Sequence, residues 1–148
     1  MRAREYFEGI RSTTFERDKT ALQLKEIEDR LTAPSTPTIG GTSRQRTVRG
    51  IDDRLANVER RRSRLLKRLG KLDNEIMQAE GVLYDEGGLC DYLSDIYGDI
   101  VFARFFENLQ WKQISKRFDL SVTTTRGMFN TALATIDEHG LLDRLCVA

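Results

Sequence analysis

A long heptad repeat constrains this chain more than any other feature of its sequence. Between residues 51 and 83, apolar residues recur in steps of four and three, which places them on one stripe of a helix. These positions are Ile51, Leu55, Val58, Leu65, Leu69, Leu72, Ile76 and Leu83, with Arg62 and Ala79 at the intervening seam positions. A helix of about 50 Å cannot keep such a stripe exposed to water. The repeat therefore predicts a partner helix.

The N-terminal segment provides a partner for this stripe. A second, weaker stripe consists of Ala3, Tyr6, Ile10, Leu24, Ile27 and Leu31, interrupted by Thr13, Arg17 and Thr20. Residues 32–50 contain both prolines of the chain and two adjacent glycines, which predicts a flexible linker. We therefore predict an all-α fold that begins with a long antiparallel helical (coiled-coil) hairpin over residues 1–84. The remaining apolar surface of the hairpin allows a homodimer.

A second, smaller domain is predicted over residues 89–140, after the break at Asp85–Gly88, with residues 141–148 as a tail. Its first part has an aromatic-rich stretch with helical spacing, which is more typical of a small core than of a base-stacking surface. The stretch consists of Tyr92, Leu93, Ile96, Tyr97, Ile100, Val101, Phe105 and Phe106.

The second part of this domain has the pattern of a helix-turn-helix. A helix of about two turns is expected from Trp111 to Phe118, and Asp119 can adopt the left-handed conformation at low cost. Ser121 is placed to cap the next helix by accepting from the amide of Thr123 or Thr124. That helix would bury Thr125, Phe129, Ala132, Leu133 and Ile136. A short helix, a tight turn and a longer capped helix are what a helix-turn-helix requires.

The helix-turn-helix geometry assigns roles to the remaining polar residues. The second helix of such a unit enters the major groove with its N-terminal turns foremost. We predict that base edges are read by Thr123, Arg126, Gly127 and Asn130. Contacts to the DNA backbone are predicted for Trp111, Lys112, Lys116, Arg117 and Ser121.

The charge distribution leaves open how such a unit would hold DNA. Residues 109–148 have a net charge of only +1, so they gain little from counterion release. Residues 44–72 carry eleven basic and three acidic side chains, whereas residues 73–108 carry one basic and nine acidic. The basic stretch from Arg44 to Lys71 is either a solvated helix face or an arm that contacts phosphates or an acidic partner.

No part of the sequence indicates catalysis. The one histidine, His139, is expected at the surface or at a helix C-terminus, and no phosphate-binding glycine loop is present. Cys90 and Cys146 lie far apart, which argues against a disulfide framework or a metal site, and no cofactor is expected. Neither a signal peptide nor an apolar run long enough for a membrane is found, so we expect a cytoplasmic protein.

The helix-turn-helix resembles region 4 of sigma-70-type factors. The resemblance is carried by Trp111, Gln113, Ile114, Ser115, Leu120, Ser121, Thr124, Arg126, Ala132 and Ile136. The whole chain is similar to phage and prophage proteins with a sigma-like C-terminus, near the ArpU-like late transcription regulators. That similarity lies in the order of the segments, which is the start MRAREYF, then the linker, the long apolar stripe and the helix-turn-helix. Two residues depart from the region 4 pattern, because Ser115 replaces an alanine and Thr125 replaces a buried valine.

The resemblance implies a phage- or prophage-encoded transcription regulator in the cytoplasm of a bacterial host. It would bind promoter double-stranded DNA, with host RNA polymerase as a further partner. Two alternatives remain open at this point. One is a packaging subunit of the small-terminase type, which would form rings, and the other is an adaptor that binds only protein through the acidic segment Asp85–Asp99.

Overall fold

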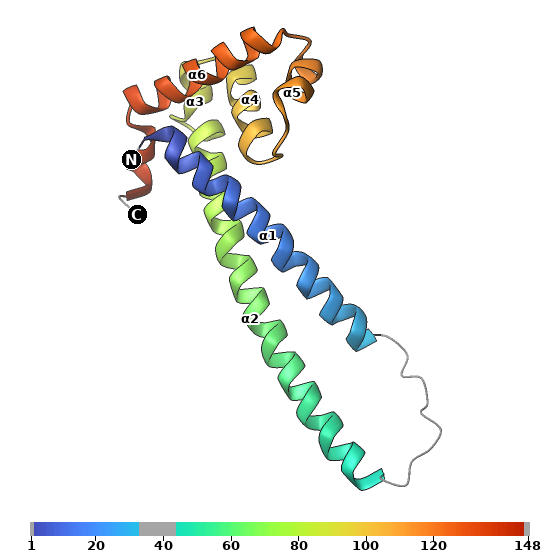
Figure 1. The fold of residues 1–148 in the computed structure, drawn as a ribbon. Helices are drawn as coiled ribbons and strands as arrows, with labels where there is room; N and C mark the ends of the chain where they lie inside the picture. Colours follow the sequence, from blue (N-terminus) through green and yellow to red (C-terminus); the bar gives the residue numbers. More distant parts are fainter. Residues whose placement is uncertain (1, 33–43, 147–148) are drawn as a thin grey trace. The chain divides into compact units, whose positions relative to one another are not determined.

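A computed structural model describes residues 2–32 and 44–146, with side chains described except at residues 44–52 and 146. These residues form helices and no strand, which confirms the predicted all-α class (Figure 1). The elements in chain order are α1 (Ala3–Thr32), α2 (Arg44–Tyr84), α3 (Leu89–Tyr92), α4 (Asp95–Phe105), α5 (Trp111–Phe118), α6 (Val122–Glu138) and the 3-10 helix η1 (Leu141–Cys146).

The chain divides into two compact units. Unit 1 contains residues 1–15 and 72–148, and unit 2 contains residues 16–71. The helices α1 and α2 each contribute one stretch to each unit. The two units are described separately below.

Unit 2 is a pair of antiparallel helical stretches whose apolar stripes face each other (Figure 1). Leu24 and Ile27 of α1 are buried with Leu65 of α2, and Val58 and Leu69 pack against them. These five residues all belong to the two predicted stripes. Two charged pairs flank the contact, one between Glu28 and Arg62 at 3.3 Å and one between Glu16 and Arg68. Because about half of each charged side chain is open to solvent, the pairs contribute little to the stability of the unit.

Part of the predicted stripe in unit 2 stays open. Leu31 is 38% exposed and Leu55 is 44% exposed. Unit 2 therefore exposes apolar surface, which a homodimer would need for its interface. The homodimer itself stays a prediction. The side chain of Ile51, also on the predicted stripe, lies outside the described residues.

The core of unit 1 joins the start of α1 to the C-terminal helices. Phe7 is fully buried, and its ring stacks on that of Phe105 with centroids 5.5 Å apart. The backbone amide of Ala3 donates a 2.7 Å hydrogen bond to Asp137 Oδ1, which caps the first turn of α1 with a carboxylate from α6. Helix α6 lies against α3, α4 and α5 (Figure 1). Other members of this core are Ile10, Ala79, Leu83, Leu89, Ile100, Val101, Ile114, Phe129 and Ile136.

The boundary between the two units differs from the predicted boundary between domains. The prediction divided the chain into a hairpin domain of residues 1–84 and a helix-turn-helix domain of residues 89–140, whereas unit 1 combines residues 1–15 with residues 72–148. The predicted stripe of α1 included Tyr6 and omitted Phe7, yet Phe7 is the fully buried residue of the pair. Residues from Leu72 onward in α2 also belong to unit 1. The ends of both long helices therefore form part of the C-terminal core.

Two smaller expectations are corrected. Helix α2 begins at Arg44, within the range of the predicted linker of residues 32–50, and residues 33–43 lie outside the described residues. The predicted tail of residues 141–148 begins instead as η1, in which Leu141 and Leu142 are buried in the core of unit 1. Arg144 adds a 3.0 Å hydrogen bond to the carbonyl of Glu86.

The aromatic-rich stretch forms a core, as predicted. Ile100, Val101 and Phe105 are buried. Tyr92 remains 46% exposed and stacks on His139, with ring centroids 4.0 Å apart. None of the helices in the described part of the chain is long and apolar enough to cross a membrane.

Replacing Phe7 with alanine is expected to destabilise unit 1 by about 3–5 kcal/mol, because the change removes a buried ring and leaves a cavity. The fluorescence of Trp111, the only tryptophan, reports the unfolding of unit 1 in a urea titration. The matched control is Phe15→Ala, since Phe15 lies on the same helix and is 56% exposed. Equal shifts of the two midpoints would contradict the assignment of the start of α1 to this core.

Candidate nucleic-acid interface

The turn between α5 and α6 has the predicted conformation. Asp119 adopts the left-handed region at φ 54° and ψ 45°, one of two described non-glycine residues with positive φ. The amide of Leu120 donates to the carbonyl of Ser115 at 2.9 Å, which closes the end of α5. The chain then enters α6 directly at its N-cap, Ser121.

Ser121 caps α6 as its position predicted. Its hydroxyl oxygen accepts from the amide of Thr124 at 3.1 Å, and the same hydroxyl lies 2.8 Å from Thr124 Oγ1. The cap satisfies one of the amides that a helix start leaves without a partner. The cap therefore holds the first turn of α6 through Ser121 and Thr124.

The buried face of α6 is the predicted one. Its buried residues are Thr125, Phe129, Ala132, Leu133 and Ile136. From α5, Ile114 and Ser115 are buried beside them, and Trp111 meets the ring of Phe129 edge to face, with centroids 4.9 Å apart. The two helices therefore pack as one unit.

Both departures from the region 4 pattern are accommodated. The hydroxyl of Thr125 is fully buried and donates to the carbonyl of Ser121 at 2.8 Å. The hydroxyl of Ser115 donates to the carbonyl of Lys112 at 2.9 Å. Each buried hydroxyl thus has a backbone acceptor one turn earlier, so neither adds an unpaired polar group to the core.

The opposite face of α6 is exposed and polar. It presents the predicted base-reading residues Thr123, Arg126, Gly127 and Asn130. A Cβ added at Gly127 would meet no atom within 4 Å. The fold itself therefore does not require a glycine at position 127, and the helix surface there is open to an incoming molecule.

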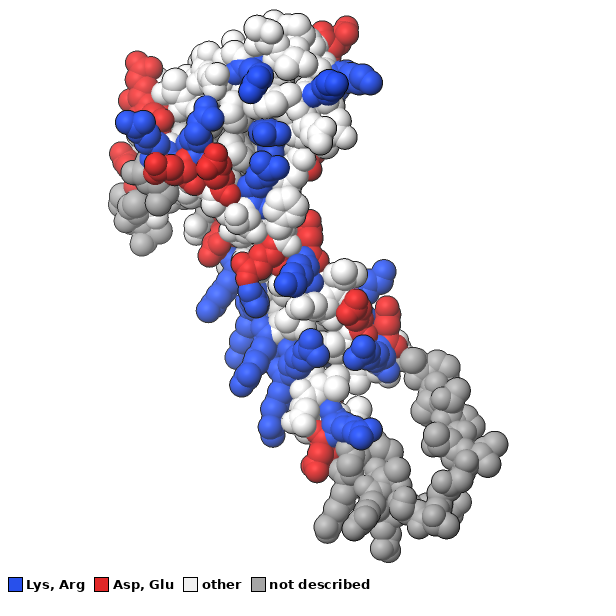
Figure 2. Space-filling view, in the orientation of Figure 1, with Lys and Arg blue, Asp and Glu red and all other residues white. Residues whose placement is uncertain are grey.

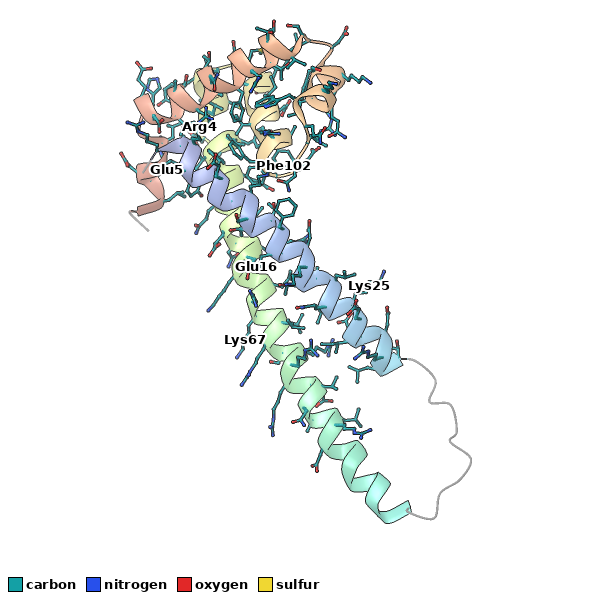
Figure 3. The ribbon with its side chains drawn as sticks, in the orientation of Figure 1. Arg4, Glu5, Glu16, Lys25, Lys67 and Phe102 are labelled. Carbon is teal, nitrogen blue, oxygen red and sulfur yellow. The ribbon has the colours of Figure 1, made fainter. Side chains whose placement is uncertain are left out.

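Two of these residues contact neighbouring helices, Arg126 the ring of Trp111 on α5 and Asn130 the side chain of Arg4 on α1. The guanidinium of Arg126 lies 5.6 Å from the ring centroid of Trp111. Asn130 Oδ1 accepts a 3.0 Å hydrogen bond from Arg4, which Figure 3 places at the N-terminal end of α1. A carbonyl oxygen has two lone pairs, so Asn130 keeps one lone pair and its amide group for a ligand.

The residues predicted to contact the DNA backbone differ in their surroundings. Lys112 and Lys116 are exposed and form no ion pair within the described part of the chain. Arg117 is paired with Glu107, whose carboxylate competes with any phosphate. Trp111 is half-buried and serves the packing of α5 on α6.

Sequence reasoning missed three basic residues that the fold brings to this interface. They are Arg4, Arg11 and Arg104. Arg4 and Arg11 are seven residues apart and share one face of α1, which is a signal that the sequence does contain. Arg104 lies in the otherwise acidic segment of residues 73–108, and only the folded structure shows that it faces Trp111, at 4.8 Å from the ring centroid.

The basic stretch from Arg44 to Lys71 belongs to unit 2, and its described side chains, from residue 53 onward, include an exposed stripe on α2. The stripe consists of Arg60, Arg64, Lys67 and Lys71, spaced by four, three and four residues. Figure 2 shows basic side chains gathered along this side of α2, and Lys67 points away from α1 in Figure 3. No acidic side chain of the described residues pairs with these four, whereas Arg62 and Arg68 pair with α1.

His139 and Cys90 have described surroundings, whereas the side chain of Cys146 lies outside the described residues. His139 is exposed and stands at the C-cap of α6, as its position predicted. Cys90 is a free thiol, half-buried next to Gly98. Within residues 2–32 and 53–145, no group of His, Cys, Asp and Glu side chains is arranged to hold a metal ion.

Comparisons with protein-family models, with curated proteins and with solved structures gave no match.

Replacing Ser121 with alanine is expected to lower the stability of unit 1 by about 1 kcal/mol, because the amide of Thr124 loses its cap. A urea titration followed by Trp111 fluorescence measures the change. Thr123→Ala is the matched control, since the Thr123 side chain is exposed and should change stability by less than about 0.5 kcal/mol. An unchanged midpoint in Ser121→Ala would show that the cap does not stabilise α6.

Proposed function

We propose that this chain is a DNA-binding transcription regulator that places the first turns of α6 in the major groove of double-stranded DNA. The observation that carries the proposal is the division of α6 into two faces. One face is buried against α4 and α5, and the other presents small polar side chains around an open glycine. The left-handed Asp119 closes α5 and the Ser121 cap starts α6 directly after it, a short connection of the kind found in helix-turn-helix units.

The size of the exposed side chains supports entry into a groove. Thr123 and Gly127 lie about one turn apart on α6, so the helix surface between them is low. A low surface lets the helix backbone come close to base edges, where Asn130 and Arg126 supply the longer polar groups. Asparagine pairs well with adenine and arginine with guanine in the major groove.

The weak net charge of residues 109–148 is supplemented locally by arginines that lie next to α6. Arg4 and Arg11 from α1 and Arg104 from α4 add three positive charges beside α6. Counterion release by such groups is a main source of DNA affinity. These arginines give the surroundings of α6 a local positive charge, although unit 1 as a whole carries more acidic than basic side chains.

The resemblance to sigma region 4 gives the proposal its biological setting. It favours a regulator encoded by a phage or prophage, active in the cytoplasm of a bacterial host and acting with RNA polymerase on promoter DNA. In vitro transcription with bacterial RNA polymerase, on a template that carries the selected binding site, tests this role. A change in transcript level that depends on both the site and the protein is expected.

DNA binding itself is tested by selecting duplexes from a random pool and measuring affinity by fluorescence anisotropy. We expect one preferred sequence, and we expect Asn130→Ala to weaken its binding by about 1–3 kcal/mol and to relax the preference at one base pair. Asn74→Ala is the matched control, since Asn74 is an exposed asparagine on α2. Equal affinity for all duplexes, with no effect of Asn130→Ala, would refute sequence-specific regulation.

Gly127→Ala separates folding from binding. Alanine should stabilise α6 by about 1 kcal/mol, because glycine is a poor helix former and the new Cβ meets nothing within the protein. The same Cβ should weaken specific DNA binding, because it stands between the helix backbone and the bases. Urea titration and anisotropy on one preparation measure both effects. Tighter folding with unchanged DNA affinity would mean that DNA does not approach α6 at this point.

A further inference from the structure

Beside α6, unit 1 contains a cavity of about 340 Å³ whose lining is dominated by arginine. Arg4 and Arg11 enter it from α1, Arg104 from α4 and Arg126 from α6. The single acidic residue of the lining is Glu8. Four guanidinium groups thus face one small space with one carboxylate among them.

None of the four arginines is neutralised by the contacts that hold it. Arg4 donates to Asn130 Oδ1 at 3.0 Å, and Arg11 donates to Asn108 Oδ1 at 2.9 Å. Arg104 donates to the carbonyl of Leu109 at 3.0 Å. These acceptors are all uncharged, and no ion pair of the described residues involves any of the four arginines.

Aromatic rings hold the guanidinium groups without using up their hydrogen-bond donors. Arg104 and Arg126 both lie over Trp111, at 4.8 and 5.6 Å from its centroid, and Arg4 lies 5.9 Å from the centroid of Phe129. A guanidinium has five N–H donors, of which a ring contact occupies none. Most of the donors around the cavity therefore remain free for a ligand.

The positive charges also act on one another. Burial lowers the pKa of Arg104, and the charges of Arg11 and Arg126 lower it further. Guanidinium groups keep their charge in proteins, so this repulsion is a cost that the folded chain carries. An anion in the cavity would remove it.

We infer that this cavity is a binding pocket for a phosphate group. Arginine forks match the oxygens of phosphate, and several guanidinium groups can share one phosphate because its oxygens accept bonds in many directions. The fixed rings of Trp111 and Phe129 preorganise the donors before the ligand arrives.

The phosphate has two possible sources. Arg126 and Asn130 belong both to the cavity and to the exposed face of α6, so a phosphodiester of the DNA backbone can reach the pocket while α6 lies in the groove. This source rests on the proposed function. A free phosphorylated compound is the other source, and it does not need DNA.

Titration of the protein with inorganic phosphate tests the pocket directly. Trp111 is the only tryptophan and lines the cavity, so its fluorescence should change and saturate. Arg11→Gln and Arg104→Gln should each weaken phosphate binding by about tenfold or more. Arg2→Gln, which removes an exposed charge outside the lining of the cavity, should leave the affinity unchanged. A response that does not saturate, or that Arg2→Gln alters as much as Arg104→Gln does, would overturn the proposal.

The conservative variant Arg104→Lys keeps the positive charge and removes the planar set of guanidinium donors. It therefore separates the recognition of phosphate from the folding of unit 1. It should retain the wild-type urea midpoint and still weaken phosphate binding. Wild-type affinity for phosphate in this variant and in Arg104→Gln would overturn the proposal.

The salt dependence of DNA affinity distinguishes the two sources. The logarithm of the DNA association constant falls linearly with the logarithm of the salt concentration. If the pocket takes a backbone phosphate, Arg104→Gln should make this slope less steep by about one. An unchanged slope together with lost phosphate binding assigns the pocket to a free phosphorylated compound. Phosphate binding in a protein that binds no duplex at all would refute the proposed function and leave the pocket standing.

Discussion

The burial of Phe7 is the contact on which the organisation of unit 1 depends. Its ring fills the core against Phe105, and the amide of Ala3 is held by Asp137 four turns along α6 from the cap at Ser121. Together these contacts fix the first turns of α1 beside the C-terminal helices. Everything that α1 contributes to the interface follows from this attachment, because Arg4 and Arg11 occupy the adjacent face of the same helix.

The shape of the interface and its charge therefore come from different parts of the chain. Helices α5 and α6 supply a capped, exposed helix face within a segment, residues 109–148, that is nearly neutral. The start of α1 and the middle of α4 supply the arginines, and Trp111 connects the two sets because it packs on Phe129 and lies under Arg104 and Arg126. A change in Trp111 should thus disturb packing and charge placement at once.

Sequence reasoning worked where the interactions are local. The left-handed Asp119 and the Ser121 cap each involve partners within four residues, so their spacing in the sequence determines them. It worked less well where burial depends on remote partners. Phe7 is buried against Phe105, far away in the sequence, and nothing near Phe7 signals that contact.

The sequence by itself determined the all-α class, the two-stripe packing of α1 on α2 within unit 2 and the helix-turn-helix with its buried and exposed faces. Only the tertiary structure decided which charges surround α6. Helical periodicity and caps act over one or two turns and are written in neighbouring residues. Electrostatic surroundings depend on how distant segments pack, which is why an arginine pocket drawn from α1, α4 and α6 has no single motif in the sequence.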